Sequence, residues 1–224
     1  NCFNKLILEG ANSIVHLGKS KDGYGLLFGQ GFGKKSTFIP EIRCKDRDNL
    51  LIVTRDEKMA LSMFELSAMS VLYEELHTNA DKENALVYIV DLFADELTDE
   101  ECDFEYLESQ FPQQVKLAKI GDVDELIDSL YETMVGRSEG RVPSDERIFL
   151  MFFGINRARK LRTGRIYDED RNGEISTIEM LQKIILNGPK YGINSLVWGE
   201  SLKSIELMLG DRYDSMFDKR VAFE

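Results

Sequence analysis

Short hydrophobic runs alternate along the chain with longer stretches in which hydrophobic residues recur at helical spacing. The runs predict strands at residues 13–17, 25–28, 50–54, 85–91, 115–120, 148–153, 195–198 and 220–223. From residue 50 onward they are continuously hydrophobic, which is typical of parallel strands buried on both faces. The stretches between them predict helices at residues 57–76, 122–134, 177–186 and 201–209. This alternation predicts an α/β fold in which helices cover both faces of a mostly parallel sheet.

The first part of the chain differs from the rest because it holds predicted strands without a predicted helix. We therefore expect a β-rich lead-in over residues 1–45, packed on a core domain of residues 46–224. Polar segments predict exposed loops at residues 78–84, 95–101, 136–145 and 162–174. With 224 residues, of which 43% are hydrophobic and 30% charged, the chain is long enough for a sizeable core and is not a disordered polymer.

The charge and the cysteine content indicate which partners and which cellular compartment to expect. The net charge of -12 repels phosphate backbones and argues against a free-standing nucleic-acid clamp. Cys2, Cys44 and Cys102 form no CxxC pair, which predicts a reducing, cytoplasmic compartment and no structural zinc. The longest apolar run, residues 148–153, is far below the roughly 20 residues of a membrane span. Because there is neither an initiator Met nor a signal peptide, we expect a piece of a longer protein.

A nucleotide site in such a sheet is expected where the first core strand turns into its helix, since helix N-termini present free N–H groups to phosphate. The turn that stands in this place consists of Thr54, Arg55, Asp56, Glu57 and Lys58. A phosphate loop reads G-x-x-x-x-G-K-[ST], and counted from Thr54 none of its four required residues is present. Asp56 and Glu57 would also repel phosphate. The sequence therefore predicts a vestigial nucleotide position.

A second near-match to this motif lies upstream, at residues 29–36, with the sequence GQGFGKKS. It deviates only at the sixth position, where Lys34 replaces glycine. Pro40 stands where the following helix should continue. Two interpretations remain open: a glycine-rich β-turn, or the unorthodox phosphate loop of an active NTPase that uses Lys35.

A third motif is the run DEDRNGEISTIE at residues 168–179, which satisfies the 12-residue EF-hand loop with its glycine at the sixth position. The predicted calcium ligands are Asp168, Asp170, Asn172, Glu174 through its carbonyl, Ser176 and the bidentate Glu179. One hypothesis is thus a calcium-binding regulatory domain. The alternative is an acidic surface loop that caps the next helix. Gly164 within the entering helix and the lack of a second EF-hand motif favour the cap.

Four segments, taken in order, resemble the ATPase domain of the FtsK/SpoIIIE family of DNA and protein translocases, which includes EssC-type secretion motors. They are DNLLIV at 48–53, VYIVD at 87–91, residues 181–198 around GPKYGIN, and FDKRVAF at 217–223. The resemblance implies a three-layer, RecA-like P-loop NTPase fold, ATP as the cofactor, and sister ATPase modules in a ring oligomer as partners. It also implies DNA or protein as the cargo, and the five basic residues between 157 and 165 are one candidate contact for it, or otherwise a solvated face.

The departures from this family concern its chemistry. The family's Walker B strand ends in acidic residues, which handle Mg²⁺ and the attacking water. The matching residues, 148–156, contain no carboxylate, and the position of the polar sensor falls near Gly199. Phosphoryl transfer depends on such charge-stabilising groups. We therefore predict a degenerate, non-hydrolysing module with no catalytic residue, which acts in assembly, partner docking or regulation of an active sister module.

Overall fold

The computed structural model describes residues 23–26, 40–78, 85–93, 104–144, 146–162, 165–166 and 175–223. Its centre is a six-stranded sheet in which every pair of neighbouring strands is parallel. The strand order is β10-β3-β9-β6-β4-β5. The strands are β3 (Leu50–Val53), β4 (Ala85–Asp91), β5 (Val115–Ala118), β6 (Arg147–Phe153), β9 (Ile193–Gly199) and β10 (Lys219–Ala222). All six strands predicted from residue 50 onward are present.

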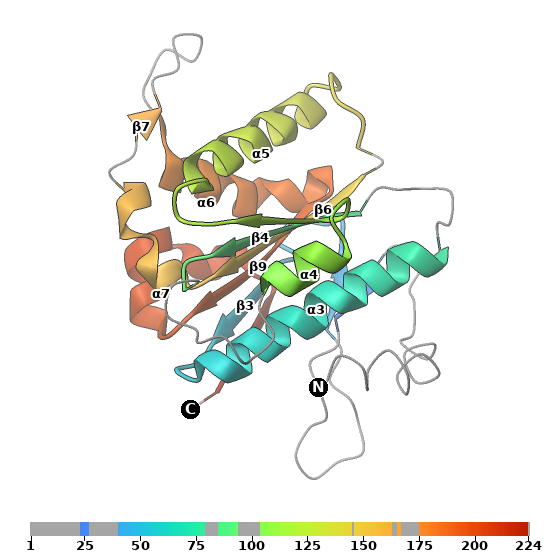
Figure 1. Cartoon of the computed structure of the whole chain (residues 1–224). Helices are drawn as coiled ribbons and strands as arrows, with labels where there is room; N and C mark the ends of the chain where they lie inside the picture. Colours follow the sequence, from blue (N-terminus) through green and yellow to red (C-terminus); the bar gives the residue numbers. More distant parts are fainter. Residues whose placement is uncertain are drawn as a thin grey trace.

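Helices cover both faces of the sheet and make the three-layer arrangement seen in Figure 1. One face carries α3 (Glu57–Thr78) and α4 (Phe104–Gln110). The other carries α5 (Val123–Ser138), α6 (Thr177–Asn187) and α7 (Leu202–Leu209). Successive sheet residues enter opposite cores: Leu51 packs on the α5–α6 side and Ile52 on the α3 side. Because β3 is covered on both faces, it carries hydrophobic residues at every position.

Smaller elements complete the described chain. Strands β1 (Gly23–Gly25) and β2 (Glu41–Arg43) form an antiparallel pair, and both Ile42 of β2 and Leu26, just after β1, are buried in the α3-side core. A second short pair joins β7 (Arg165–Ile166) to β8 (Ile175–Ser176). The 3₁₀ turns are η1 (Ile155–Arg162), η3 (Gly188–Tyr191) and η4 (Tyr213–Met216). The predicted division at residue 45 stays a prediction, as does the strand at 13–17, which lies outside the described residues.

One predicted loop is partly wrong. Residues 136–145 were expected to be exposed, but α5 continues to Ser138 and both Gly136 and Arg137 are buried. Arg137 is buried because its guanidinium donates a hydrogen bond to the carbonyl oxygen of Tyr191 at 2.8 Å. Helix α4 and strand β2 had no predicted counterpart.

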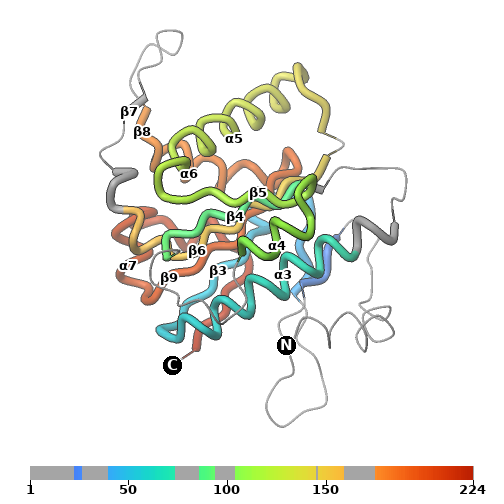
Figure 2. Tube along the Cα trace, in the orientation of Figure 1, coloured from blue at the N-terminus to red at the C-terminus, as the bar shows by residue number. Residues whose placement is uncertain are grey.

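The chain path in Figure 2 brings distant segments together at the sheet. Strand β10, the last of the described chain, lies beside β3, the first strand of the parallel sheet. The loops that follow all the parallel strands therefore gather at one edge, which we call the carboxyl edge, and the strand beginnings gather at the opposite, amino edge. No helix within the described ranges combines the length and hydropathy needed to cross a bilayer.

Candidate functional site

The carboxyl edge is the expected ligand position of an open parallel sheet. Here the three residues Thr54, Arg55 and Asp56 join β3, the second strand in the sheet order, directly to α3. Thr54 is buried, whereas Arg55, Asp56 and Lys58 are exposed and Glu57 is half-buried. The predicted vestigial phosphate position thus lies between the first strand of the parallel sheet and the first long helix, and its relation to a nucleotide stays a prediction.

Hydrogen bonds within this turn occupy N–H groups of the helix start. The Asp56 N–H donates to Oγ1 of Thr54 at 3.1 Å, and the Met59 N–H donates to Oδ1 of Asp56 at 2.9 Å. The Ala60 N–H donates to the carbonyl oxygen of Asp56 at 3.0 Å, which is the first helical bond of α3. Asp56 therefore acts as the N-cap, and its carboxylate lies at the positive end of the helix dipole, where a phosphate would otherwise bind.

Aromatic side chains pack beneath this turn. The indole of Trp198 on β9 is fully buried, and its Nε1 donates to the carbonyl oxygen of Thr54 at 3.0 Å. Its ring lies 4.4 Å from that of Phe153 and 5.0 Å from that of Phe93, measured between centroids. The Arg157 guanidinium stacks on Phe93, with its Cζ 3.5 Å from the ring centroid. This aromatic cluster fills the space behind the edge with apolar groups.

Gly154 shows how closely the cluster approaches the backbone. It follows β6 with a φ of 90°, which favours glycine. A Cβ at this position would lie 2.3 Å from Cε2 of Phe93. A side chain there would therefore clash with the aromatic cluster as well as strain the backbone.

The polar groups at this edge bond to one another. Strand β6 ends in Phe152 and Phe153 without a carboxylate. Beyond it, Nδ2 of Asn156 donates to Oε1 of Glu200 at 2.9 Å, which links the segments after β6 and β9. After β4, the Phe93 N–H donates to Oδ1 of the buried Asp91 at 2.8 Å. In the described part of the edge we find no cluster of three or more His, Cys, Asp or Glu residues placed to hold a metal.

The other two predicted sites fall mainly outside the described residues. The glycine-rich segment 29–36 does so entirely, as do Asp168, Asp170, Asn172 and Glu174 of the calcium loop. Glu179 is described, and its Oε2 accepts hydrogen bonds from the Ser176 N–H and Oγ, both at 2.8 Å. In return, Oγ of Ser176 accepts from the Glu179 N–H at 3.3 Å. These bonds form the capping box of α6, while the calcium site stays a prediction.

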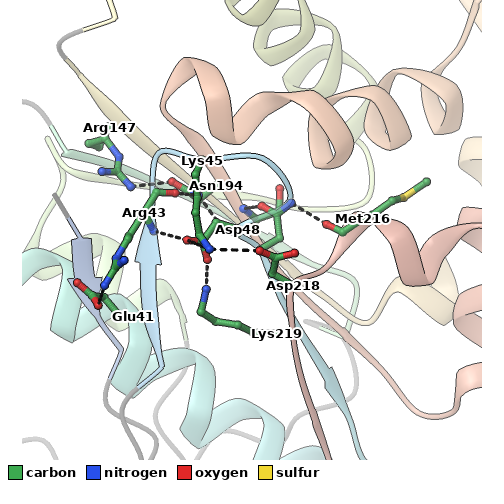
Figure 3. A network of polar contacts seen from close by, with 11 residues as sticks. Glu41, Arg43, Lys45, Asp48, Arg147, Asn194, Met216, Asp218 and Lys219 are labelled. Carbon is green, nitrogen blue, oxygen red and sulfur yellow. Dashed lines mark hydrogen bonds and ion pairs between the residues drawn. The ribbon is translucent and has the colours of Figure 1, made fainter. Parts of the chain in front are cut away.

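A polar network at the amino edge was not predicted (Figure 3). Its centre is Asp48, whose side chain is fully buried. Its carboxylate accepts a hydrogen bond from the Arg43 N–H at 3.1 Å and contacts Nζ of Lys219. Nζ of Lys45 lies 3.8 Å away. The pKa of Lys219 is lowered to about 8, chiefly by burial and also by the cationic Lys45 and Arg43, while Glu41 opposes the shift.

Two buried asparagines extend the network. Nδ2 of Asn194 donates to the carbonyl oxygens of Arg43 and Asp48, at 3.0 and 2.8 Å, and its Oδ1 accepts from Arg147 at 2.7 Å. These contacts tie the connection before β3 to the beginnings of β6 and β9. Three neighbouring strands of the sheet are thereby held through a single side chain.

Asn49 forms a similar set of hydrogen bonds, which reaches the helix α6 side of the sheet. Its Nδ2 donates to the carbonyl oxygens of Ile185 and Met216, and its Oδ1 accepts from the Ser195 N–H at 2.7 Å. The only sequence signal for the network is the polar pair Asp48 and Asn49 directly before a hydrophobic run, and its partners are distant in sequence.

No protein-family model and no curated protein matches the sequence. Solved structures do match its fold. The conjugation coupling protein TcpA of pCW3, in its monomer form with ATPγS, superimposes with a TM-score of 0.57 at 13% identity, over 93% of this chain and 56% of TcpA. The cytoplasmic domain of EssC gives 0.53 at 10% identity, over 92% of this chain and 35% of that one.

A third structure is the cytoplasmic domain of EccC, the type VII secretion ATPase of Thermomonospora curvata. It gives a TM-score of 0.51 at 13% identity, over 90% of this chain and 23% of EccC. The chain thus spans between about a quarter and just over half of the proteins it matches. These neighbours are FtsK/SpoIIIE-type ATPases, and at such low identity the likeness concerns the fold. The predicted resemblance is confirmed at that level: this chain has the three-layer, RecA-like fold of FtsK/SpoIIIE-type ATPase domains.

Proposed function

We propose that this chain is a non-hydrolysing, ATPase-like module of an FtsK/SpoIIIE-type translocase, acting on the cytoplasmic side in assembly, partner docking or regulation of an active sister module. The observation that carries the proposal is the turn between β3 and α3. Its three residues leave no loop to wrap a phosphate chain, and the Asp56 carboxylate occupies the helix N-terminus. A triphosphate would meet a negative charge in place of free N–H groups.

The rest of the carboxyl edge supports the same proposal. Hydrolysis needs carboxylates to hold Mg²⁺ and orient water, and β6 ends in two phenylalanines instead. Asn156 and Glu200 are bonded to each other across the neighbouring strands. A group that approached Oε1 of Glu200 would therefore have to displace the Asn156 amide.

Sister modules are the proposed partners. The matched proteins are longer than this chain, and another of them, EssC (ATPases 2 and 3) from Geobacillus thermodenitrificans, matches with a TM-score of 0.51 at 11% identity. An inactive copy in such an arrangement would contribute surfaces to a ring rather than chemistry. The fold occurs in both secretion and conjugation proteins, so it does not discriminate between protein and DNA as cargo.

Binding and hydrolysis assays with ATP and Mg²⁺ test the proposal. We expect no saturable binding by calorimetry up to about 1 mM ATP, the upper end of ordinary Michaelis constants, and no turnover. Tight binding lost in Lys58→Ala would overturn it and restore a nucleotide site after β3. Turnover lost in Lys35→Ala, with Lys58→Ala unaffected, would overturn it in favour of the active NTPase with a phosphate loop at 29–36.

A further inference from the structure

Strand β5 is the outermost strand on one side of the parallel sheet. Its free side is an edge in a different sense from the carboxyl and amino edges, which are formed by the strand ends. The Val87 N–H of β4 donates to the carbonyl oxygen of Gln114, so the backbone groups of Gln114, and of alternate residues after it, face β4. The intervening residues Val115 and Leu117 therefore direct their N–H groups away from the sheet. An exposed edge of this kind is a template on which another chain can add a strand.

Each outward N–H of β5 already has an acceptor from the same chain. The Val115 N–H donates to the carbonyl oxygen of Phe111 at 2.8 Å. The Leu117 N–H donates to Oε1 of Glu108 at 2.9 Å. The next alternate residue, Lys119, donates its N–H to Oδ2 of Asp122 at 3.2 Å. The bond of Leu117 is the informative one, because its acceptor is a side chain nine residues away on a separate helix.

Helix α4 holds Glu108 in position. Phe104 and Leu107 are buried against the α3-side core and fix the helix beside β5. Glu108 follows Leu107 and is half-buried. A carboxylate that accepts from a backbone N–H forms a charge-assisted bond, which is stronger than a neutral one.

Two large apolar residues near this strand are exposed. Tyr106 on α4 is 47% exposed and Ile120, just after β5, is 46% exposed. The ion pair between Glu105 and Lys119, at 2.5 Å, links the two segments that carry them. If the Leu117 N–H were free, β5 of a second copy, related by a two-fold axis, could bond to it with these two side chains beside the contact.

We propose that Glu108 is an edge guard: its carboxylate occupies the Leu117 N–H and so prevents a second copy of this chain from pairing its own β5 with this edge. The inference does not depend on the proposed function, since it concerns the side of the sheet farthest from β3 and β10.

Sedimentation velocity over a concentration series measures the self-association of Glu108 variants and so tests the proposal. We expect the wild-type chain to stay monomeric and Glu108→Ala to dimerise with an association constant at least about tenfold higher. Glu108→Gln keeps an acceptor oxygen and should stay monomeric. Glu105→Ala is the matched control, because it removes a carboxylate from the same helix without freeing a strand N–H.

Amide exchange at Leu117 locates the association. In Glu108→Ala this amide should exchange at least about tenfold faster than in the wild type when the protein is dilute, and regain protection as the concentration rises. If Glu108→Ala does not fold, Glu108→Met keeps the side-chain length without an acceptor, with Glu105→Met as its control. Glu108→Ala, or Glu108→Met in its place, that stays monomeric at all concentrations would overturn the proposal, and so would dimers without protection of Leu117.

Discussion

The indole nitrogen of Trp198 donates a hydrogen bond to the carbonyl oxygen of Thr54, 3.0 Å away, and so ties strand β9 to the turn that follows β3. Both groups are buried. The bond holds the peptide from which a phosphate loop would have to begin, and it joins that peptide to the aromatic cluster below it. The shape of the turn thus depends on a residue contributed by another strand.

Trp198→Phe should therefore destabilise the fold by about 2–4 kcal/mol, since it leaves the Thr54 carbonyl unpaired and a cavity beside Phe153. Urea unfolding followed by far-UV circular dichroism measures this, because Trp198 is the sole tryptophan of the chain and its fluorescence is lost. Tyr106→Phe, on an exposed residue, is the control and should change stability by less than about 0.5 kcal/mol. Equal stability of the two variants would contradict the assigned role.

Asn49→Ala should be among the most destabilising polar substitutions, by about 3 kcal/mol or more, because it leaves three buried backbone groups without their partner. Asn49→Asp should also destabilise, since a carboxylate still accepts from Ser195 but cannot donate to the two carbonyl oxygens. Asn187→Ala provides a half-buried asparagine control. Equilibrium unfolding of all three variants checks the order, and a neutral Asn49→Ala would refute it.

The pH dependence of stability should carry a signature of Lys219. Burial, with Lys45 and Arg43 nearby, lowers its pKa to about 8, against 10.5 for the ordinary group. Between these values the unfolded chain binds more protons, so the stability of the wild type relative to Lys219→Met should rise with pH. Below about pH 8 both states are protonated and the difference should be flat. Urea unfolding from pH 7 to about pH 10.5 tests the sign, and a falling difference would contradict it.

Glu179 belongs both to the capping box of α6 and to the predicted calcium loop, and two variants distinguish these roles. Ser176→Ala removes the N-cap acceptor and should cost about 1 kcal/mol of unfolding free energy. Glu179→Gln keeps an oxygen for the capping box, so its effect on stability should be smaller. The predicted calcium loop requires a saturable Ca²⁺ heat in calorimetry that Glu179→Gln abolishes. A wild-type chain that gives no such heat would leave Glu179 as a cap alone.

The sheet was predictable because its signal is local. A strand buried on both faces needs an unbroken hydrophobic run, and β6 shows one in the printed sequence. Helix α4 was missed because its acidic residues indicate a solvated segment, although Phe104 and Leu107 are spaced for one buried face. Arg137 shows the opposite error, because it was expected to be exposed and is buried. Its hydrogen-bond acceptor, the carbonyl oxygen of Tyr191, is 54 positions away in the sequence, and only the fold brings the two together.

The turn between β3 and α3 was predicted from the sequence, whereas its hydrogen bonds were not, and its relation to a nucleotide stays a prediction. The missing glycines and lysine were evident from the sequence, but the capping role of Asp56 depends on the path of the backbone. The amino-edge network was beyond local reasoning, because Asp48 and Lys219 are separated by 171 positions. No pattern within a window of the sequence connects two such residues.

The fully enclosed carboxylate of Asp48 has a consequence for biosynthesis. During synthesis the other five strands of the sheet emerge before β10, and of the two lysines beside Asp48 in the finished fold only Lys45 is then present to balance the anion. We therefore expect the segment around Asp48 to pack last, once the strand that begins at Lys219 has emerged.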